Sequence, residues 1–157
     1  MTDALHPAIR PLAFLLGTWK GAGRGDFPTA HPFEYGEEMR IGHAGKPFLF
    51  YEQRTWNPAD GTPLHSEAGY FRISDDGTVE FVVAQPTGIA EVLVGPLNGT
   101  SFDLHSTGIL LTPTAKETVA VGRDFTVTGD RLRYRLDLEA VGEAYVTHLE
   151  AELTRVP

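Results

Sequence analysis

The sequence contains no cysteine, and this absence removes several classes of chemistry at once. Disulfide bonds, thiolate nucleophiles, iron–sulfur clusters and cysteine-based zinc sites are all excluded. Basic residues are also in the minority, with 13 Lys and Arg against 21 Asp and Glu. The formal net charge of −8 argues against a nucleic-acid partner, because binding to phosphates requires a basic surface.

Long apolar segments are missing as well. No stretch of the chain approaches the roughly 20 apolar residues that a membrane-spanning helix needs. Residues 1–7 contain no basic stretch followed by an apolar run, so we expect no secretory leader. We therefore expect a cytoplasmic protein without a membrane partner. The 157 residues suffice for a buried core, and we expect a single domain over residues 1–157.

Alternation of apolar and polar residues dominates most of the chain and predicts β-strands. In residues 131–140 one face is apolar and the other is charged. The apolar face consists of Leu132, Tyr134, Leu136, Leu138 and Ala140. Residues 48–56 and 78–85 show similar extended patterns. Only residues 8–16 look helical, and Pro11 limits that helix to a turn or two.

Pairs of residues that contain glycine and favour tight turns separate the predicted strands. The pairs are Asp60-Gly61, Asp76-Gly77, Asn98-Gly99 and Gly129-Asp130. Connections this short leave no room for crossover helices, which argues against a parallel sheet. The sequence therefore predicts an all-β fold, an antiparallel sandwich or barrel with a short N-terminal helix.

The segment from Gly17 to Gly25 is unusually rich in glycine. It does not match a dinucleotide-binding fingerprint, because Pro28 and Pro32 follow where a helix should begin. A structural interpretation fits better. We expect Trp19 to close one end of the barrel, and we expect the glycines to let the first strand bend sharply.

Six histidines are the main chemical resource of the chain. None of them has the spacing of a zinc protease motif. His148 and Glu150 are spaced to share a metal on one strand face, but a solvated face is the simpler explanation. The serines do not lie in the strand-to-helix elbow that is typical of hydrolase nucleophiles.

The position of His148 depends on how the last strand is read. Leu149 and Leu153 belong to the apolar face of residues 144–156, and His148 has the opposite parity. Alternation therefore predicts an outward, exposed histidine. An inward His148 would require a bulge near Thr147 or a position before the regular pairing begins.

Several of these motifs together resemble the nitrobindin family of haem proteins. Gly17-Thr18-Trp19-Lys20-Gly21-Ala22-Gly23 matches the Gly-x-Trp-x-Gly-x-Gly signature of that family. Further similar stretches follow in the order of the family: residues 27–29, 33–38, 45–47, 64–70, 114–117 and 147–149. The resemblance therefore covers nearly the whole chain.

The resemblance implies an antiparallel β-barrel of about ten strands, shaped like the lipocalins and fatty-acid-binding proteins. It also implies one haem b per chain near the mouth of the barrel. The single axial histidine of the family falls on His148, which reverses the outward position predicted from alternation. A neutral imidazole is a good fifth ligand for haem iron. With no methionine or second histidine expected opposite, the sixth position would be open to a small ligand.

The resemblance assigns further residues to the haem site. The implied cavity-lining positions are Leu64, His65, Gln85 and Leu138. Alternation agrees for Leu138, which it already turns inward. Thr29 and Lys116 lie in motifs where family members contact the haem, and Lys116 is placed to pair with a propionate. An ordinary surface lysine explains Lys116 equally well.

The implied function is binding of nitric oxide by ferric haem and isomerisation of peroxynitrite to nitrate, so nitric oxide and peroxynitrite are the expected partners. The net charge of −8 does not explain attraction of an anion, and Lys116 and Arg123 are the candidate local cations. Two alternatives stay open: a non-catalytic carrier of an apolar small molecule, and a structural domain with a filled interior. The residues also leave a homodimer open.

Overall fold

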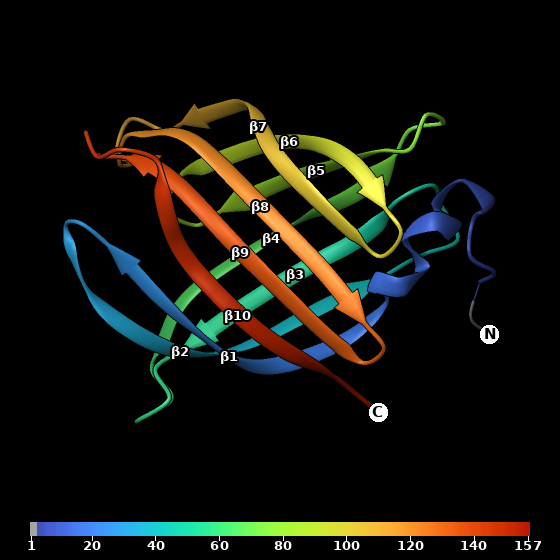
Figure 1. The fold of residues 1–157 in the computed structure, drawn as a ribbon, viewed down its shortest axis with the longest axis horizontal. Helices are drawn as coiled ribbons and strands as arrows, with labels where there is room; N and C mark the ends of the chain where they lie inside the picture. The colour runs from blue at the N-terminus through green and yellow to red at the C-terminus, as the bar shows by residue number, and fades with distance from the viewer. Residues whose placement is uncertain (1–2) are drawn as a thin grey trace.

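Short turns connect neighbouring strands along the whole chain, as the glycine-containing pairs predict. The computed structural model describes residues 3–157, and it forms ten antiparallel strands after one short helix (Figure 1). The elements are η1 (Pro7–Leu15), β1 (Gly17–Phe27), β2 (Ala30–Gly42), β3 (Leu49–Trp56), β4 (Pro63–Ile73), β5 (Thr78–Gln85), β6 (Ile89–Asn98), β7 (Ser101–Leu111), β8 (Thr118–Thr128), β9 (Arg131–Ala140) and β10 (Val146–Val156).

The strands close into a barrel in which each strand pairs with its neighbours in sequence. The order is β1-β10-β9-β8-β7-β6-β5-β4-β3-β2, and pairing between β1 and β10 joins the two ends of the sheet. The predicted all-β antiparallel barrel of about ten strands is therefore confirmed. Within the described residues, no helix has the length and apolar character needed to cross a membrane.

Local pattern accounts for the strands that were predicted most clearly. In β9 the predicted apolar face points inward, and Leu132 is fully buried. In β5 the inward residues Val79 and Phe81 are also fully buried. The turns follow their predicted chemistry, because Gly77 and Gly129 have φ angles of 84° and 60°, a left-handed region that favours glycine.

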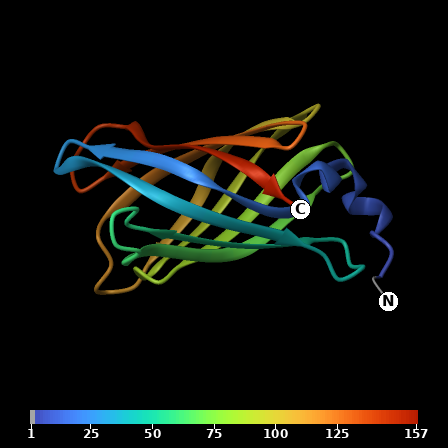
Figure 2. The same cartoon turned by 90° about the horizontal axis from the view of Figure 1, so that it is seen from below.

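A 3₁₀ helix covers one end of the barrel (Figure 2). Its Ile9, Leu12 and Leu15 are fully buried. The helix is one residue earlier than predicted and runs for nine residues, since the tight 3₁₀ geometry accommodates Pro11 inside it. Trp19 lies beneath the helix with no exposed surface, and its Nε1 donates a hydrogen bond to the Leu15 carbonyl at 2.9 Å. The prediction that Trp19 closes one end is confirmed.

Aromatic rings fill the half of the barrel next to the helix. Phe71 and Phe81 stack with ring centroids 4.0 Å apart, and Phe102 and Phe125 stack at 5.1 Å. These rings come from the helix-side portions of β4, β5, β7 and β8. The core therefore lies at this end, and the opposite half of the interior is free for a cavity.

The glycines of β1 create space inside the barrel. Gly21, Gly23 and Gly25 have the same parity as the buried Trp19, and a Cβ at any of them would collide with a neighbouring residue. The space beside Gly25 is occupied by the ring of Phe33, while Gly21 faces the backbone of β10. The predicted bend of β1 stays a prediction, and the contacts add that the missing side chains make room for neighbouring residues.

We expect Gly21→Ala to destabilise the barrel, because its Cβ would collide with the Glu152 carbonyl, which is held in the sheet. Overpacking of this kind costs roughly 1–3 kcal/mol of unfolding free energy. Chemical denaturation measures the effect. Gly42→Ala is the matched control, because a Cβ there meets nothing within 4 Å. Equal stability of the two variants would contradict the crowding argument.

Candidate functional site

A cavity occupies the half of the barrel that lies away from η1. Its volume is about 520 Å³, within the range of about 300–1,000 Å³ that is typical of cofactor and ligand sites. Its walls include Phe33 and Leu149 near the mouth and Tyr51 and Phe125 deeper inside. This cavity rules out the alternative of a structural domain with a filled interior.

Five of the seven residues assigned from the family resemblance line this one cavity. They are Leu64 and His65 from β4, Gln85 from β5, Leu138 from β9 and His148 from β10. These side chains are distant in sequence and meet because the strands close into a barrel.

Two assigned residues lie outside the cavity wall. Thr29 sits in the turn between β1 and β2, and Lys116 sits in the loop between β7 and β8. Both are exposed, and neither is among the described residues that line the cavity. Both connections lie at the mouth end, because every second connection of an antiparallel barrel falls on the same rim. Their contact with a haem stays a prediction.

A β-bulge turns His148 into the cavity. In the pairing of β10 with β9, Thr147 lies opposite Asp137 and Leu149 lies opposite Leu136. His148 is thus the extra residue of the bulge, without a partner on β9. The outward position predicted from alternation is therefore wrong, because alternation assumes unbroken pairing. The bulge lies next to Thr147, where the sequence required it.

The imidazole of His148 is held in one orientation. Its Nδ1 lies 2.8 Å from the carbonyl oxygen of Asp26. A carbonyl can only accept, so Nδ1 donates the proton, and the lone pair of a neutral ring is then on Nε2. The rings of Phe27 and Phe33 meet the imidazole edge-on at centroid distances of 5.6 and 6.4 Å. Metal-binding histidines typically donate their other ring N–H to a carbonyl or carboxylate in this way.

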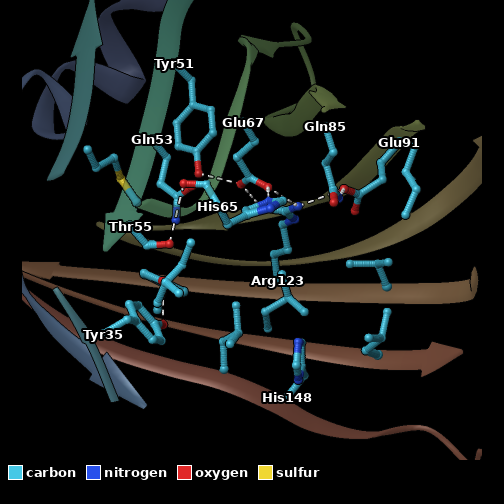
Figure 3. Close-up of a pocket in the computed structure, with 18 of the residues that line it drawn as sticks. Tyr35, Tyr51, Gln53, Thr55, His65, Glu67, Gln85, Glu91, Arg123 and His148 are labelled. Carbon is cyan, nitrogen blue, oxygen red and sulfur yellow. Dashed lines mark hydrogen bonds and ion pairs between the residues drawn. The ribbon is translucent and has the colours of Figure 1, made fainter. Parts of the chain in front are cut away.

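Across the cavity from His148 lies a cluster of buried charges, here called the ionic wall: Glu67, Glu91 and Arg123 (Figure 3). Arg123 Nη1 contacts Glu67 Oε1 at 2.5 Å, and Arg123 Nη2 contacts Glu91 Oε2 at 2.8 Å. Arg123 is 4% exposed and Glu91 is fully buried. Tyr51 donates a further hydrogen bond to Glu67 at 2.7 Å.

The protonation of the ionic wall follows from these contacts. Burial alone would raise the pKa of Glu67, but Arg123 and the hydrogen bonds from His65 and Tyr51 hold that pKa well below its ordinary range. Burial would lower the pKa of Arg123, but Glu67 and Glu91 raise it well above its ordinary value. Glu67 and Arg123 are therefore ionised and form a buried ion pair, and Glu91 Oε2 contacts the same guanidinium.

The ionic wall also holds two of the assigned cavity residues. His65 Nε2 lies 3.5 Å from Glu67 Oε2, and the Gln85 amide donates to Glu91 Oε2. His65 therefore lies on the wall that faces His148, within the cavity lining to which the family resemblance assigned it. Arg123 was a candidate cation for attracting an anion, but its two carboxylate partners neutralise it.

Comparison with known proteins also identifies the chain as a haem-binding β-barrel domain. The family model described as the THAP4-like, heme-binding beta-barrel domain matches residues 8–155. The chain belongs to this family. The assignment made from the motifs is thereby confirmed, and haem binding is the property by which the family is described.

Named relatives of this haem-binding family are similar over their whole length. Peroxynitrite isomerase 2 of Mycobacterium ulcerans (strain Agy99) is 50% identical over 99% of each chain. Peroxynitrite isomerase 1 of Mycobacterium tuberculosis (strain H37Rv) is 47% identical, again over 99% of each chain.

Solved structures agree on the fold. The crystal structure of Rv2717c from M. tuberculosis superposes with a TM-score of 0.92, at 46% identity, over 98% of this chain and 100% of that chain. The S-type phycobiliprotein lyase CPES of Guillardia theta is 10% identical, with a TM-score of 0.62 over 93% of this chain and 90% of that chain. The second likeness shows only that the barrel fold recurs.

Sequence reasoning missed the ionic wall of this haem-binding barrel, although a signal was present. Each of these three charged residues occupies an inward position on a strand that also places a buried apolar residue inward, namely Phe71, Leu93 and Phe125. Charges of opposite sign at buried positions of separate strands predict pairing inside the barrel. The register that brings them together appears only in the folded chain.

Another buried carboxyl, that of Glu37 on β2, lies apart from the ionic wall and contacts Tyr134 of β9. Glu37 has no exposed surface, and Tyr134 donates a hydrogen bond to its Oε1. The hydroxyl of Tyr134 also lies 2.8 Å from that of Tyr35. Burial raises the pKa of Glu37 to about 8, because no cation pairs with its carboxyl among the described residues. Glu37 is thus protonated at neutral pH.

Glu37 makes stability dependent on pH. Its carboxyl ionises near its ordinary pKa of 4.5 in the unfolded chain but near 8 in the barrel, so the folded state holds an extra proton between these values. The unfolding free energy therefore falls as the pH rises from about 4.5 to about 8. Glu37→Gln mimics the protonated form and should be more stable than the parent at pH 8, by roughly 3–5 kcal/mol.

Urea unfolding at several pH values measures this difference. Glu52→Gln, which changes an exposed carboxyl on the outer face of β3, is the control and should follow the pH dependence of the parent. Parallel stability curves for the parent and Glu37→Gln would show that Glu37 is ionised throughout.

Proposed function

We propose that this protein binds one haem b through His148 and isomerises peroxynitrite to nitrate, and that it also binds nitric oxide. The observation that carries the proposal is the bulged His148, whose Nδ1 bonds to the Asp26 carbonyl and whose Nε2 is left for a metal. Membership of a haem-binding family and relatives named peroxynitrite isomerase support it.

The residues of the cavity fit a haem. A planar, largely apolar ring needs apolar walls and one fixed nitrogen ligand. Leu138 and Leu149 provide such walls beside His148, and Phe33 lies against its imidazole. Lys116 at the rim would pair with a propionate, and Thr29 would lie at the same rim.

The reaction is an isomerisation, so peroxynitrite and nitrate contain the same atoms and carry the same charge. No second substrate is therefore required. When bound, a ferric haem supplies an iron centre with an open position for a small ligand. The protein contributes attachment through His148, orientation through the Asp26 carbonyl, and a facing wall on which His65 and Gln85 are held by carboxylates.

The ionic wall weighs against a fatty-acid carrier. Such a carrier needs an unengaged cation to pair with the carboxylate of its ligand. Arg123 is already paired with Glu67 and Glu91. Among described residues, the cavity wall contains no other arginine or lysine.

The cytoplasmic location and a homodimer stay predictions.

Titration with hemin tests the proposal. We expect a saturable Soret band for the parent, and loss or shift of that band with a hemin affinity lower by more than about tenfold for His148→Ala, because the iron loses its ligand. The matched control is His105→Ala on the outer face of β7, which should bind hemin like the parent.

Rapid mixing with peroxynitrite then measures catalysis. The hemin-loaded parent should accelerate decay and increase the yield of nitrate over nitrite, whereas His148→Ala should not. An unchanged Soret band in His148→Ala would refute the assignment of the ligand.

A further inference from the structure

A cavity that holds an anion needs a positive charge or a hydrogen-bond donor in its wall. Among the described residues that line the cavity, three side chains are able to carry a positive charge: His65, Arg123 and His148. The chain as a whole has a formal net charge of −8, so attraction of an anion depends on such local groups.

Arg123 is not available to a ligand. Its Nη1 and Nη2 both contact Glu67, and Nη2 also contacts Glu91. Its Nε is the one nitrogen without a partner, and that atom is buried. The charge of the guanidinium is therefore balanced by Glu67, and its remaining donor is out of reach.

His148 is also committed. Its Nδ1 donates to the Asp26 carbonyl, and its Nε2 is the atom that the proposed function gives to the iron. A proton on Nε2 would compete with the metal. His65 is thus the one side chain of the described cavity wall that is free to meet an anion with a positive charge.

Alternation in β4 places His65 beside Glu67. The two residues are two positions apart and share the inward face, and His65 Nε2 lies 3.5 Å from Glu67 Oε2. A carboxylate only accepts, so Nε2 carries the proton of the neutral ring and Nδ1 carries the lone pair. A second proton, on Nδ1, makes the ring a cation with a donor for a ligand.

We propose that His65 is the anion-binding residue of the cavity, which takes up a proton together with the anion and holds that anion opposite His148 (Figure 3). The proposal rests on the proposed function and adds the residue that recognises its anionic substrate. Uptake of a proton with the anion leaves the total charge inside the barrel unchanged, so no charge is buried without a partner. Histidine suits this role because its charge changes near neutral pH.

Other titratable and charged side chains face His65 in the cavity. They are Glu34 of β2, Tyr51 of β3, Glu67 of β4, Glu91 of β6, Arg123 of β8 and His148 of β10. Glu67 contacts the ring directly and favours its protonated form, and Arg123, which is paired with Glu67, opposes it. One unit charge several ångströms from an anion changes affinity about tenfold or more, and the 30% exposure of the His65 side chain favours the lower value.

The first experiment measures azide binding to the hemin-loaded protein from the Soret band as a function of pH. Azide stays an anion from about pH 6 to about pH 8, whereas a histidine loses its proton in this range. The azide affinity of the parent should fall about tenfold as the pH rises across the range. His65→Gln, which cannot become a cation, should change less than about twofold and should bind azide about tenfold more weakly than the parent at about pH 6.

His105→Gln on the outer face of β7 is the matched control and should follow the parent. Nitric oxide is a neutral ligand, and its affinity for the parent and for His65→Gln should agree within about twofold, which also shows that the variant holds hemin. Equal pH dependence of azide binding in the parent and in His65→Gln would overturn the proposal. A Soret band of a haem with two histidine ligands that disappears in His65→Gln would also overturn it, because His65 would then bind the iron itself.

The second experiment uses the apoprotein and sodium nitrate. NMR follows the ring signals of the histidines, and the His65 signal is assigned by its absence in His65→Gln. Nitrate should move the titration midpoint of His65 to higher pH by more than that of His105, because the anion stabilises the cation in the cavity while His105 reports the general effect of salt. Equal shifts of the two midpoints would contradict the proposal.

The two experiments separate this proposal from the proposed function. If hemin does not bind while nitrate raises the midpoint of His65, the proposed function fails and the anion site stands. If hemin binds through His148 while neither azide affinity nor the nitrate effect depends on His65, the haem site stands and the anion site fails.

Discussion

Closure of the sheet between β1 and β10 is the constraint on which the site depends. This pairing runs from Thr18 opposite Val156 to Gly25 opposite Leu149. It carries the end of β1 to the start of β10 and so places the Asp26 carbonyl beside His148, 122 residues away in sequence. Without closure, the histidine would have no partner for its Nδ1 and no cavity to face. Barrel formation and site formation are therefore one event.

The interior combines two arrangements that are usually kept apart. At the helix end, stacked aromatic rings stabilise the barrel by burial, the main favourable contribution to folding. In the middle, Arg123 and two carboxylates lie buried, where desolvation is expensive and close pairing only partly offsets it. A hydrophobic replacement of similar volume would stabilise such a centre equally well or better. The charges are therefore better explained by the chemistry of the cavity than by stability.

Local sequence predicted the fold well because strands and tight turns are specified by nearby residues. The alternation in β9 and the Asp76-Gly77 turn are examples in which periodicity and glycine chemistry suffice. The bulge at His148 could not be predicted this way, because alternation assumes unbroken pairing and the extra residue shows only in the register of β10 against β9. Only the family resemblance placed the side chain of His148 inside the barrel, and the pairing of β10 with β9 supplies the physical reason.

Non-local register explains what else sequence could not supply. The inward parity of Glu67 was readable, but its contact with Arg123 joins residues 56 apart on β4 and β8. Thr29 and Lys116 show the opposite case, since a motif assigned them to the haem while the structure places them in exposed connections at the mouth. Residues at the rim of the barrel can contact a haem only when the haem is bound, so the protein chain alone does not reveal these contacts.

The helix η1 and the end of β10 lie at the same closed end of the barrel, where Arg155 packs over the Trp19 ring at 4.2 Å (Figures 1 and 2). Polypeptide joined before η1 or after β10 would therefore extend away from the mouth. This geometry lets the barrel serve as a module: it can be tethered, immobilised or fused through its helix end while small molecules still reach the cavity from the opposite side.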